Sequence, residues 1–183
     1  MTDDLANGSI LPDFRREVPD GDDRTRRICN TCNFIDYVNP KIVAGSVVTR
    51  GDRILLCRRA IEPRKGFWTL PAGFMEENET VEDAARREAR EEACADIRIE
   101  QVLAIYSVPR ISQVQVMFRA SLESEIAAGP ESEEVGLFAW KDIPWSELAF
   151  PTVVWALTQY AATRHLSAFP PFTNPPRTEN LTR

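Results

Sequence analysis

Four glutamates and one arginine stand at fixed intervals in one part of the chain. Glu79 is followed eight positions later by Arg87. Glu88 comes directly after Arg87, and Glu91 and Glu92 follow four and five positions after it. Residues three and four apart share one face of a helix, so these last three carboxylates would project together. Like charges at that spacing repel one another, whereas Mg²⁺ takes carboxylate oxygens as ligands. The spacing therefore predicts a Mg²⁺ site made by Glu88, Glu91 and Glu92.

A helix must present these carboxylates, and the flanking residues indicate where it starts. Thr80 with Asp83 three positions on is typical of a helix N-terminus, with a side-chain cap and an acid in the first turn. Small apolar residues then recur at helical spacing and would form the packing stripe. They are Ala84, Ala85, Ala89 and Ala93.

The whole run from Gly73 to Ala95 resembles the Nudix box, G-x5-E-x7-R-E-U-x-E-E-x-G-U, in which U is aliphatic. Every fixed position matches except one, where Cys94 replaces a glycine of the family. That glycine closes the helix, often at positive φ, so a cysteine there would cost about 1 kcal/mol if the backbone is unchanged. The resemblance implies an α/β fold, the Nudix α/β/α sandwich with a mixed sheet.

The resemblance also implies chemistry. Nudix enzymes hydrolyse a pyrophosphate bond in nucleoside diphosphate derivatives with the help of Mg²⁺, or of Mn²⁺ in its place. A backbone carbonyl near Gly73 is implied as a further metal ligand, and Arg87 is expected to pair with Glu79 or a box carboxylate and hold the cluster in shape. The base is open: it is a box carboxylate, or a glutamate in the loop 129–134. The candidate catalytic residues are Arg87, Glu79, Glu88, Glu91, Glu131 and Glu134.

Other residues before and after the box are candidates for substrate binding. Arg58, Arg59 and Arg64 would contact phosphates, with ordinary surface charge as the alternative. Phe74 and Tyr106 would stack on a planar ring, with core packing as the alternative.

The N-terminal part carries a single C-x2-C, Cys29 and Cys32. A structural zinc site needs four ligands, and no second pair accompanies this one, so bound zinc is not expected. Together with the runs 37–45, 55–63 and 68–76, the pair is similar to a bacterial Nudix group with an N-terminal zinc ribbon, related to plant FAD and ADP-ribose pyrophosphatases. The ribbon-like segment here is therefore interpreted as degenerate.

The resemblance constrains the identity of the substrate less than it constrains the fold. We expect FAD or ADP-ribose, with release of AMP; NADH or another nucleotide is the alternative, and so is a non-catalytic nucleotide-sensing domain. NADH pyrophosphatases carry a Ser-Gln-Pro-Trp run, and here Ser112-Gln113 lacks the Pro-Trp. Pro109 matches a single-residue marker of ADP-ribose-type members. A sensing domain usually loses box glutamates, and this chain keeps them.

Alternation and turn signals predict strands before and after the box helix. The expected strands are 42–50, 53–59, 67–70, one or two within 97–108, 113–122 and 135–140, and a second helix is expected at 152–166. We expect three parts: a tail and ribbon-like segment at 1–38, the Nudix domain at 39–166, and a proline-rich tail at 167–183 that runs over the surface.

The 183-residue chain has a net charge of -6, which argues against a general nucleic-acid or membrane binder. It contains no apolar run of about 20 residues, and its acidic N-terminus lacks the features of a signal peptide. We therefore expect a cytoplasmic protein that acts on a small nucleotide, and the resemblance implies a homodimer.

Overall fold

The computed structural model describes residues 13–178, and its contacts divide the chain into two units between Asn39 and Pro40. The predicted boundary lay one residue earlier, after residue 38. None of the helices within 13–178 is long and apolar enough to span a bilayer.

The first unit is a small antiparallel sheet of three strands, β1 (Phe14–Glu17), β2 (Arg26–Cys29) and β3 (Ile35–Asp36). The turn between β2 and β3 carries the C-x2-C, with Asn33 at φ +58° and its N–H donating to the carbonyl of Cys29. Cys29 is buried, Cys32 is exposed, and both are free thiols. These strands have four, four and two residues, too few to show a periodic pattern in a polar sequence.

The second unit is built on a mixed sheet with the strand order β10-β5-β4-β9-β8. Its long strands are β4 (Lys41–Arg50), β5 (Arg53–Arg59), β8 (Ile97–Val108), β9 (Gln113–Leu122) and β10 (Ser132–Ala139). β4 runs parallel to β9, whereas the other neighbours are antiparallel. Three short 3₁₀ turns, η1 (Pro109–Ile111), η2 (Trp140–Asp142) and η3 (Trp145–Glu147), complete its connections.

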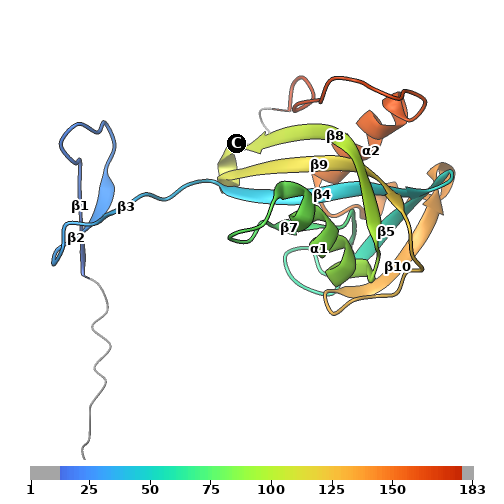
Figure 1. Cartoon of the computed structure of the whole chain (residues 1–183), viewed down its shortest axis with the longest axis horizontal. Helices are drawn as coiled ribbons and strands as arrows, with labels where there is room; N and C mark the ends of the chain where they lie inside the picture. The colour runs from blue at the N-terminus through green and yellow to red at the C-terminus, as the bar shows by residue number, and fades with distance from the viewer. Residues whose placement is uncertain (1–12, 179–183) are drawn as a thin grey trace, which may run out of the picture. The chain divides into compact units, whose positions relative to one another are not determined.

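Two helices cover this sheet, α1 (Val81–Ala93) on one face and α2 (Pro151–Thr163) on the other (Figure 1). Successive strand residues point to opposite faces, so neighbours divide between the two cores. Val47 packs in the cluster that includes α2, and Val48 packs in the cluster that includes the alanines of α1. The predicted α/β fold with a mixed sheet between helices is confirmed.

The sheet opens between β4 and β5, and this opening makes room for a site. The two strands pair only at their hairpin, where Thr49 and Arg50 lie opposite Ile54 and Arg53. Beyond it, β6 (Trp68–Thr69) pairs with β5, and β7 (Ala72–Phe74) pairs with β4. The chain from β7 then turns into α1, which brings the start of the box to the mouth of the opening.

Both ends of α1 are closed by local hydrogen bonds. Thr80 is the N-cap, and its hydroxyl accepts from the N–H of Asp83 at 3.1 Å, as predicted. At the other end Cys94 adopts the left-handed conformation, with φ +49°. Its N–H donates to the carbonyl of Arg90, which is the bond of an αL C-cap, and the N–H of Ala95 donates to the carbonyl of Ala89. The cysteine thus keeps the backbone shape that suits the family's glycine.

The described part of the proline-rich tail, residues 167–178, is mostly exposed, and it is bonded to the edge of the sheet. Phe172 donates its N–H to Leu103 and accepts from Ile105, both at 2.9 Å, so the tail extends the sheet along β8. The side chain of Asn174 bonds both backbone groups of Ser107. Phe169 and Phe172 also pack against the core beside α2. Proline lacks an N–H, but the residues between the prolines supply the donors.

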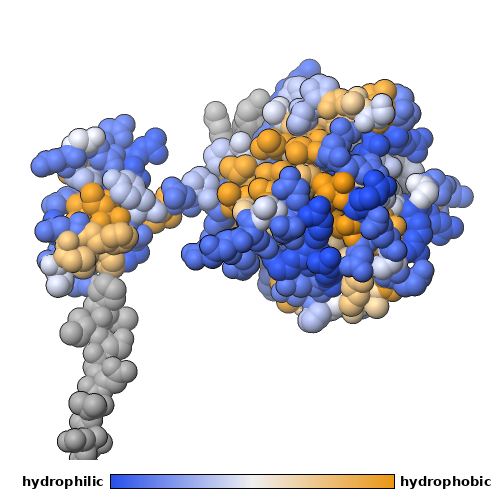
Figure 2. All heavy atoms as spheres, in the orientation of Figure 1, coloured by the Kyte–Doolittle hydropathy of each residue, from blue (hydrophilic) through white to orange (hydrophobic). Residues whose placement is uncertain are grey.

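Part of the sheet face beside α1 stays uncovered, because α1 is only 13 residues long. Figure 2 shows apolar residues gathered on this face. Ile42 and Ile105 are exposed there, and Val114 and Val116 are half-buried between them. We refer to these four residues as the apolar sheet patch.

We expect Cys94→Gly to raise the free energy of unfolding by about 0.5–1 kcal/mol, because glycine removes the strain at positive φ but gains entropy in the unfolded chain. Cys94→Ala removes the thiol and keeps the strain, so it should bring no gain. Chemical denaturation of the three proteins measures the difference, and equal gains for Gly and Ala would contradict this reading.

Candidate active site

Arg87 lies at the centre of a cluster of carboxylates that α1 and the loop before it bring together. Its Nη1 donates to Glu88 at 2.7 Å and to Glu91 at 2.8 Å. Its Nε and Nη2 bond the two oxygens of Glu79 at 3.1 and 2.8 Å, and Nη2 also donates to the carbonyl of Phe74. These contacts raise the pKa of Arg87, with the bonds to Glu79 as the largest cause.

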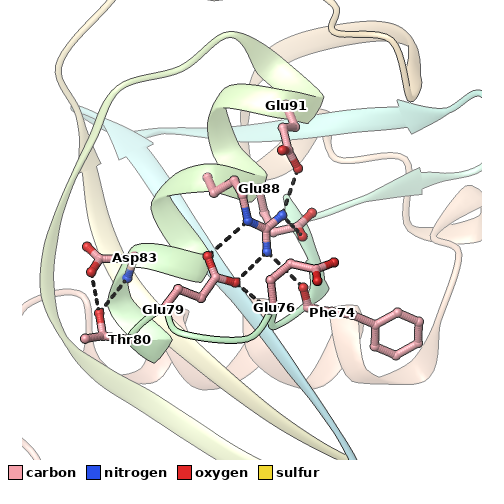
Figure 3. Close-up of polar contacts among 8 residues, drawn as sticks. Phe74, Glu76, Glu79, Thr80, Asp83, Glu88 and Glu91 are labelled. Atoms are coloured by element: carbon pink, nitrogen blue, oxygen red, sulfur yellow. Dashed lines mark hydrogen bonds and ion pairs between the residues drawn. The ribbon is translucent and has the colours of Figure 1, made fainter.

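Glu79 joins the loop to the helix. Besides its two bonds to Arg87, it accepts from the backbone N–H of Glu76 at 2.6 Å. The bonds to Arg87 hold the pKa of Glu79 below its ordinary value. Figure 3 shows Glu79, Glu88 and Glu91 turned toward one centre, whereas the Phe74 ring points away from it. The predicted pairing of Arg87 with Glu79 and box carboxylates is what the structure contains.

Position 73 lies where β7 passes close to α1, and the space there suits a glycine. A Cβ at this position would overlap the carboxylate of Glu88, so only glycine allows the backbone and that carboxylate to lie side by side. Glu88 is buried, and burial raises its pKa although Arg87 opposes the shift. A backbone segment and a carboxylate are thereby placed against each other, as the metal-ligand hypothesis requires.

Glu92 is the most deeply buried carboxylate of the cluster, with 4% of the residue exposed. One of its oxygens accepts from the N–H of Ala72 at 3.3 Å. Burial, together with the neighbouring charge of Glu88, raises the pKa of Glu92 to about 8. A carboxyl group in this state favours either a proton or a bound cation at neutral pH.

A loop after β9 closes the other side of the cluster. The N–H groups of Ala127 and Gly129 donate to the carbonyls of Ala93 and Glu92, so the loop caps the end of α1. A Cβ on Gly129 would overlap the backbone of Glu91, which explains the glycine. This contact brings Glu131 to the site, where its charge raises the pKa of both Glu88 and Glu92.

These side chains line one end of a cavity of about 560 Å³, a volume typical of ligand sites. The predicted residues that line it are Arg59, Gly73, Phe74, Arg87, Glu88, Glu91, Glu92 and Glu131. Arg59 bonds the carbonyl of Pro63, and its charge opposes the rise in the pKa of Glu92, so it lies on the cluster side.

Five predicted residues do not line this cavity, and one of them is Glu79, which Arg87 holds as described above. Arg58 and Glu134 are opposite each other on β5 and β10 and approach to 3.7 Å as an ion pair. Arg64 lies over the ring of Phe67. Tyr106 is fully buried beside Trp155, and its hydroxyl donates to Gln159. The proposed stacking role of Tyr106 is therefore corrected to core packing, because β8 turns this residue toward α2.

Other residues of the cavity were absent from the sequence-based candidates. They include Arg110, Gln113, Gln115, Phe150 and Trp155. Arg110 follows Pro109 in η1, and the two glutamines alternate on β9 toward the α2 side. The alternation of β9 could have indicated that both glutamines share a face, but it does not show that this face borders a cavity.

The donor set suits a hard divalent cation, since it consists of carboxylates and a neighbouring backbone segment. No three acidic, histidine or cysteine side chains within 13–178 stand as a ready-made metal cage. Glu88 and Glu91 are instead bridged by Arg87, as described above. A cation would therefore compete with the guanidinium for these oxygens and would draw on Glu92, whose burial disfavours an uncompensated charge.

Comparison with known proteins identifies the family of this chain. The profile of the NUDIX domain matches residues 39–160, and the zinc-ribbon profile described as "Nudix N-terminal" matches residues 13–38. The chain belongs to the Nudix family. It is a hydrolase of the pyrophosphatase type, as the relatives below also indicate.

One curated relative, an ADP-ribose pyrophosphatase of Methanocaldococcus jannaschii, is 32% identical over 119 residues, 62% of this chain and 69% of that protein. A NAD-capped RNA hydrolase NudC of Pseudomonas putida F1 is 34% identical over 122 residues, 63% of this chain but only 42% of that protein. A solved NUDIX hydrolase from Nitrosomonas europaea is 42% identical with a TM-score of 0.83, covering 91% of this chain and 97% of that one.

We expect Arg87→Met to lower the free energy of unfolding by about 2–4 kcal/mol, because it leaves Glu79 and Glu88 without their cation. The matched control is Arg86→Met, which breaks a single i,i+3 pair with Asp83 and should cost below about 1 kcal/mol. Urea denaturation of both variants without divalent cations makes the comparison. Equal losses would show that Arg87 does not organise the cluster.

Proposed function

We propose that this protein is a Mg²⁺-dependent hydrolase that cleaves the pyrophosphate bond of ADP-ribose and releases AMP. The observation that carries the proposal is the convergence of Glu88, Glu91, Glu92 and Glu131 at one end of a nucleotide-sized cavity. FAD, which also contains an adenosine diphosphate, stays a second candidate from the resemblance of the chain. ADP-ribose is favoured by the name of the Methanocaldococcus relative.

Each residue of the carboxylate cluster has its own role in the proposed reaction. Bound Mg²⁺ supplies charge neutralisation for the diphosphate and acidifies a water molecule. Glu88, Glu91 and Glu92, with the backbone near Gly73, hold the cation, and Arg87 keeps the first two carboxylates in place through its bond to Glu79. Mn²⁺ would suit the same oxygen ligands.

The cations of the cavity complete the site. Arg59 and Arg110 both line it, and neither forms an ion pair with an acidic side chain of residues 13–178. They are therefore available to phosphate oxygens, whereas Arg58 is engaged by Glu133 and Glu134. We assign the phosphate-contact role to Arg59 and Arg110.

Glu131 is our candidate for the base. It lines the cavity, is exposed, and lies close enough to Glu88 and Glu92 to raise the pKa of both. Glu134, the other loop candidate, is held by Arg58 outside the cavity. Glu91, which is also exposed and lines the cavity, stays the alternative within the box.

We expect Glu91→Gln and Glu92→Gln each to lower kcat for ADP-ribose at least ~100-fold at saturating Mg²⁺, because each removes a charged ligand. Glu82→Gln, in the exposed first turn of α1, is the matched control and should keep its activity. Released AMP is measured by chromatography, with FAD and NADH run in parallel. Turnover near that of the unchanged protein in both variants would refute the assignment.

The first unit carries a separate proposal, that Cys29 and Cys32 hold no stoichiometric zinc. Cys29 and Cys32 are the two cysteines of this unit, whereas a structural zinc site takes four ligands. Elemental analysis of protein purified without added metal should give clearly less than one zinc per chain. One zinc per chain would contradict this and would point to ligands from a second copy.

We also propose that the protein is a homodimer, as the family resemblance implies. The apolar sheet patch is the surface that we assign to the partner, because it exposes Ile42 and Ile105 to solvent. Light scattering at micromolar concentration should give twice the 20.7 kDa of one chain, and Ile105→Glu should shift it toward one chain. Particles of a single chain throughout would count against the dimer.

A further inference from the structure

One wall of the cavity presents side chains that the catalytic machinery does not use. Phe74 on β7 and Gln115 on β9 are both direct neighbours of Val43 on β4, one on each side. Residues paired in register on adjacent strands point to the same face of a sheet. All three line the cavity, so a row of an aromatic ring, a small apolar side chain and an amide forms part of its wall.

Gln115 is half of an amide pair. Its Nε2 donates to Oε1 of Gln113 at 3.1 Å, and both side chains are half-buried. Within residues 13–178 this is the one hydrogen bond that either side-chain amide makes to another protein group. The pair therefore keeps one amide oxygen and one NH₂ group for a ligand. Rotating both amides would exchange their roles but would still leave one acceptor beside one donor.

Phe74 supplies the complementary feature, a partly exposed aromatic ring. The residue is 45% exposed, and Lys41 lies 4.5 Å from the ring centroid. Adjacent strands are about 4.8 Å apart, so Phe74 and Gln115 are separated by about 10 Å across Val43. A flat heterocycle can stack on the ring and still reach the amides with its edge.

A donor beside an acceptor is the pattern that adenine presents along its edge, with the 6-amino group next to a ring nitrogen. A glutamine amide matches this pattern with paired hydrogen bonds. Phosphate groups and ribose lack a planar edge of this kind, and the carboxylates that also line the cavity would repel an anion unless a cation intervened.

We propose that Gln113, Gln115 and Phe74 form the subsite for the adenine base, with the amide pair reading its 6-amino edge. The inference rests on the proposed function, because it places the diphosphate of the same substrate at Glu88, Glu91 and Glu92. It adds the residues that select the nucleotide. The two glutamines are specificity residues and take no part in the hydrolysis.

Binding of the product tests the subsite without depending on turnover. Isothermal titration with Mg²⁺ present compares AMP with purine riboside 5′-monophosphate, which lacks the 6-amino group. The unchanged protein should bind AMP about 5- to 10-fold more tightly, as expected for one hydrogen bond. Methionine keeps the length of either side chain. In Gln115→Met, which removes the free accepting oxygen, the two ligands should bind within about twofold of each other, whereas Gln113→Met removes the donor to the ring nitrogen and should weaken both ligands.

Gln101→Met is the matched control, since this glutamine lies on β8 at the register of Arg119 and outside the cavity lining. It should keep the preference for AMP. Thermal melting checks that all three variants are folded. We expect them to fold, because the three substituted glutamines are only half-buried on the sheet.

The results distinguish failure of the adenine subsite from failure of the proposed function. An unchanged preference in both Met variants, or no binding of AMP to the unchanged protein, would overturn the adenine subsite. If the preference follows the glutamines but neither ADP-ribose nor FAD is hydrolysed, the subsite stands and the proposed function fails.

Discussion

The site depends on one guanidinium that holds carboxylates which would otherwise repel one another. Arg87 bonds Glu79 with two nitrogens and bridges Glu88 and Glu91 with a third. Because Glu79 belongs to the loop and the other two to the helix, the same contact fixes the loop against α1. The planar, always charged guanidinium suits this role, since an ammonium offers no such fork of donors.

The surrounding fold places the backbone of β7 and the loop after β9 directly beside that cluster. β4 and β5 separate beyond their hairpin, and β7 enters the opening with Gly73 against Glu88. From the far side, Gly129 allows its loop to cap α1 and to place Glu131 beside the cluster. Both glycines mark places where a Cβ would collide with the catalytic helix, so packing and chemistry are set by the same contacts.

Sequence reasoning succeeded where the contacts are local. The Thr80 cap, the shared face of the box glutamates and the pairing of Arg87 with Glu79 depend on spacings of three to eight residues within one loop and helix. The α/β fold with a mixed sheet also followed, because strand alternation and the box helix are visible in the sequence. The short strands β1, β2, β3 and β7 were missed for lack of a pattern.

Contacts between segments that are far apart in the sequence were harder to predict. Arg59 and Arg58 are adjacent, yet only the first lines the cavity, since strand neighbours point to opposite faces and the sequence does not say which face is open. Tyr106 was assigned to the ligand and lies in the core, and Gln115 was overlooked although β9 places it in the wall. Hydrogen bonds between the tail and β8 depend on Phe172 meeting Leu103 and Ile105, nearly 70 residues away.

The buried Glu92 offers the most direct test that this cluster binds a cation. With a pKa of about 8, its carboxyl group is mostly protonated at pH 7, whereas a bound cation requires the ionised form. Mg²⁺ binding should therefore release close to one proton per ion at pH 7, and affinity should rise with pH up to about 8 and then level off. Calorimetric titration of metal-free protein in buffers of different ionisation enthalpy measures this release. Release of close to one proton, absent in Glu92→Gln, is the result predicted here; Mg²⁺ binding with no proton release, or no binding at all, would contradict the account.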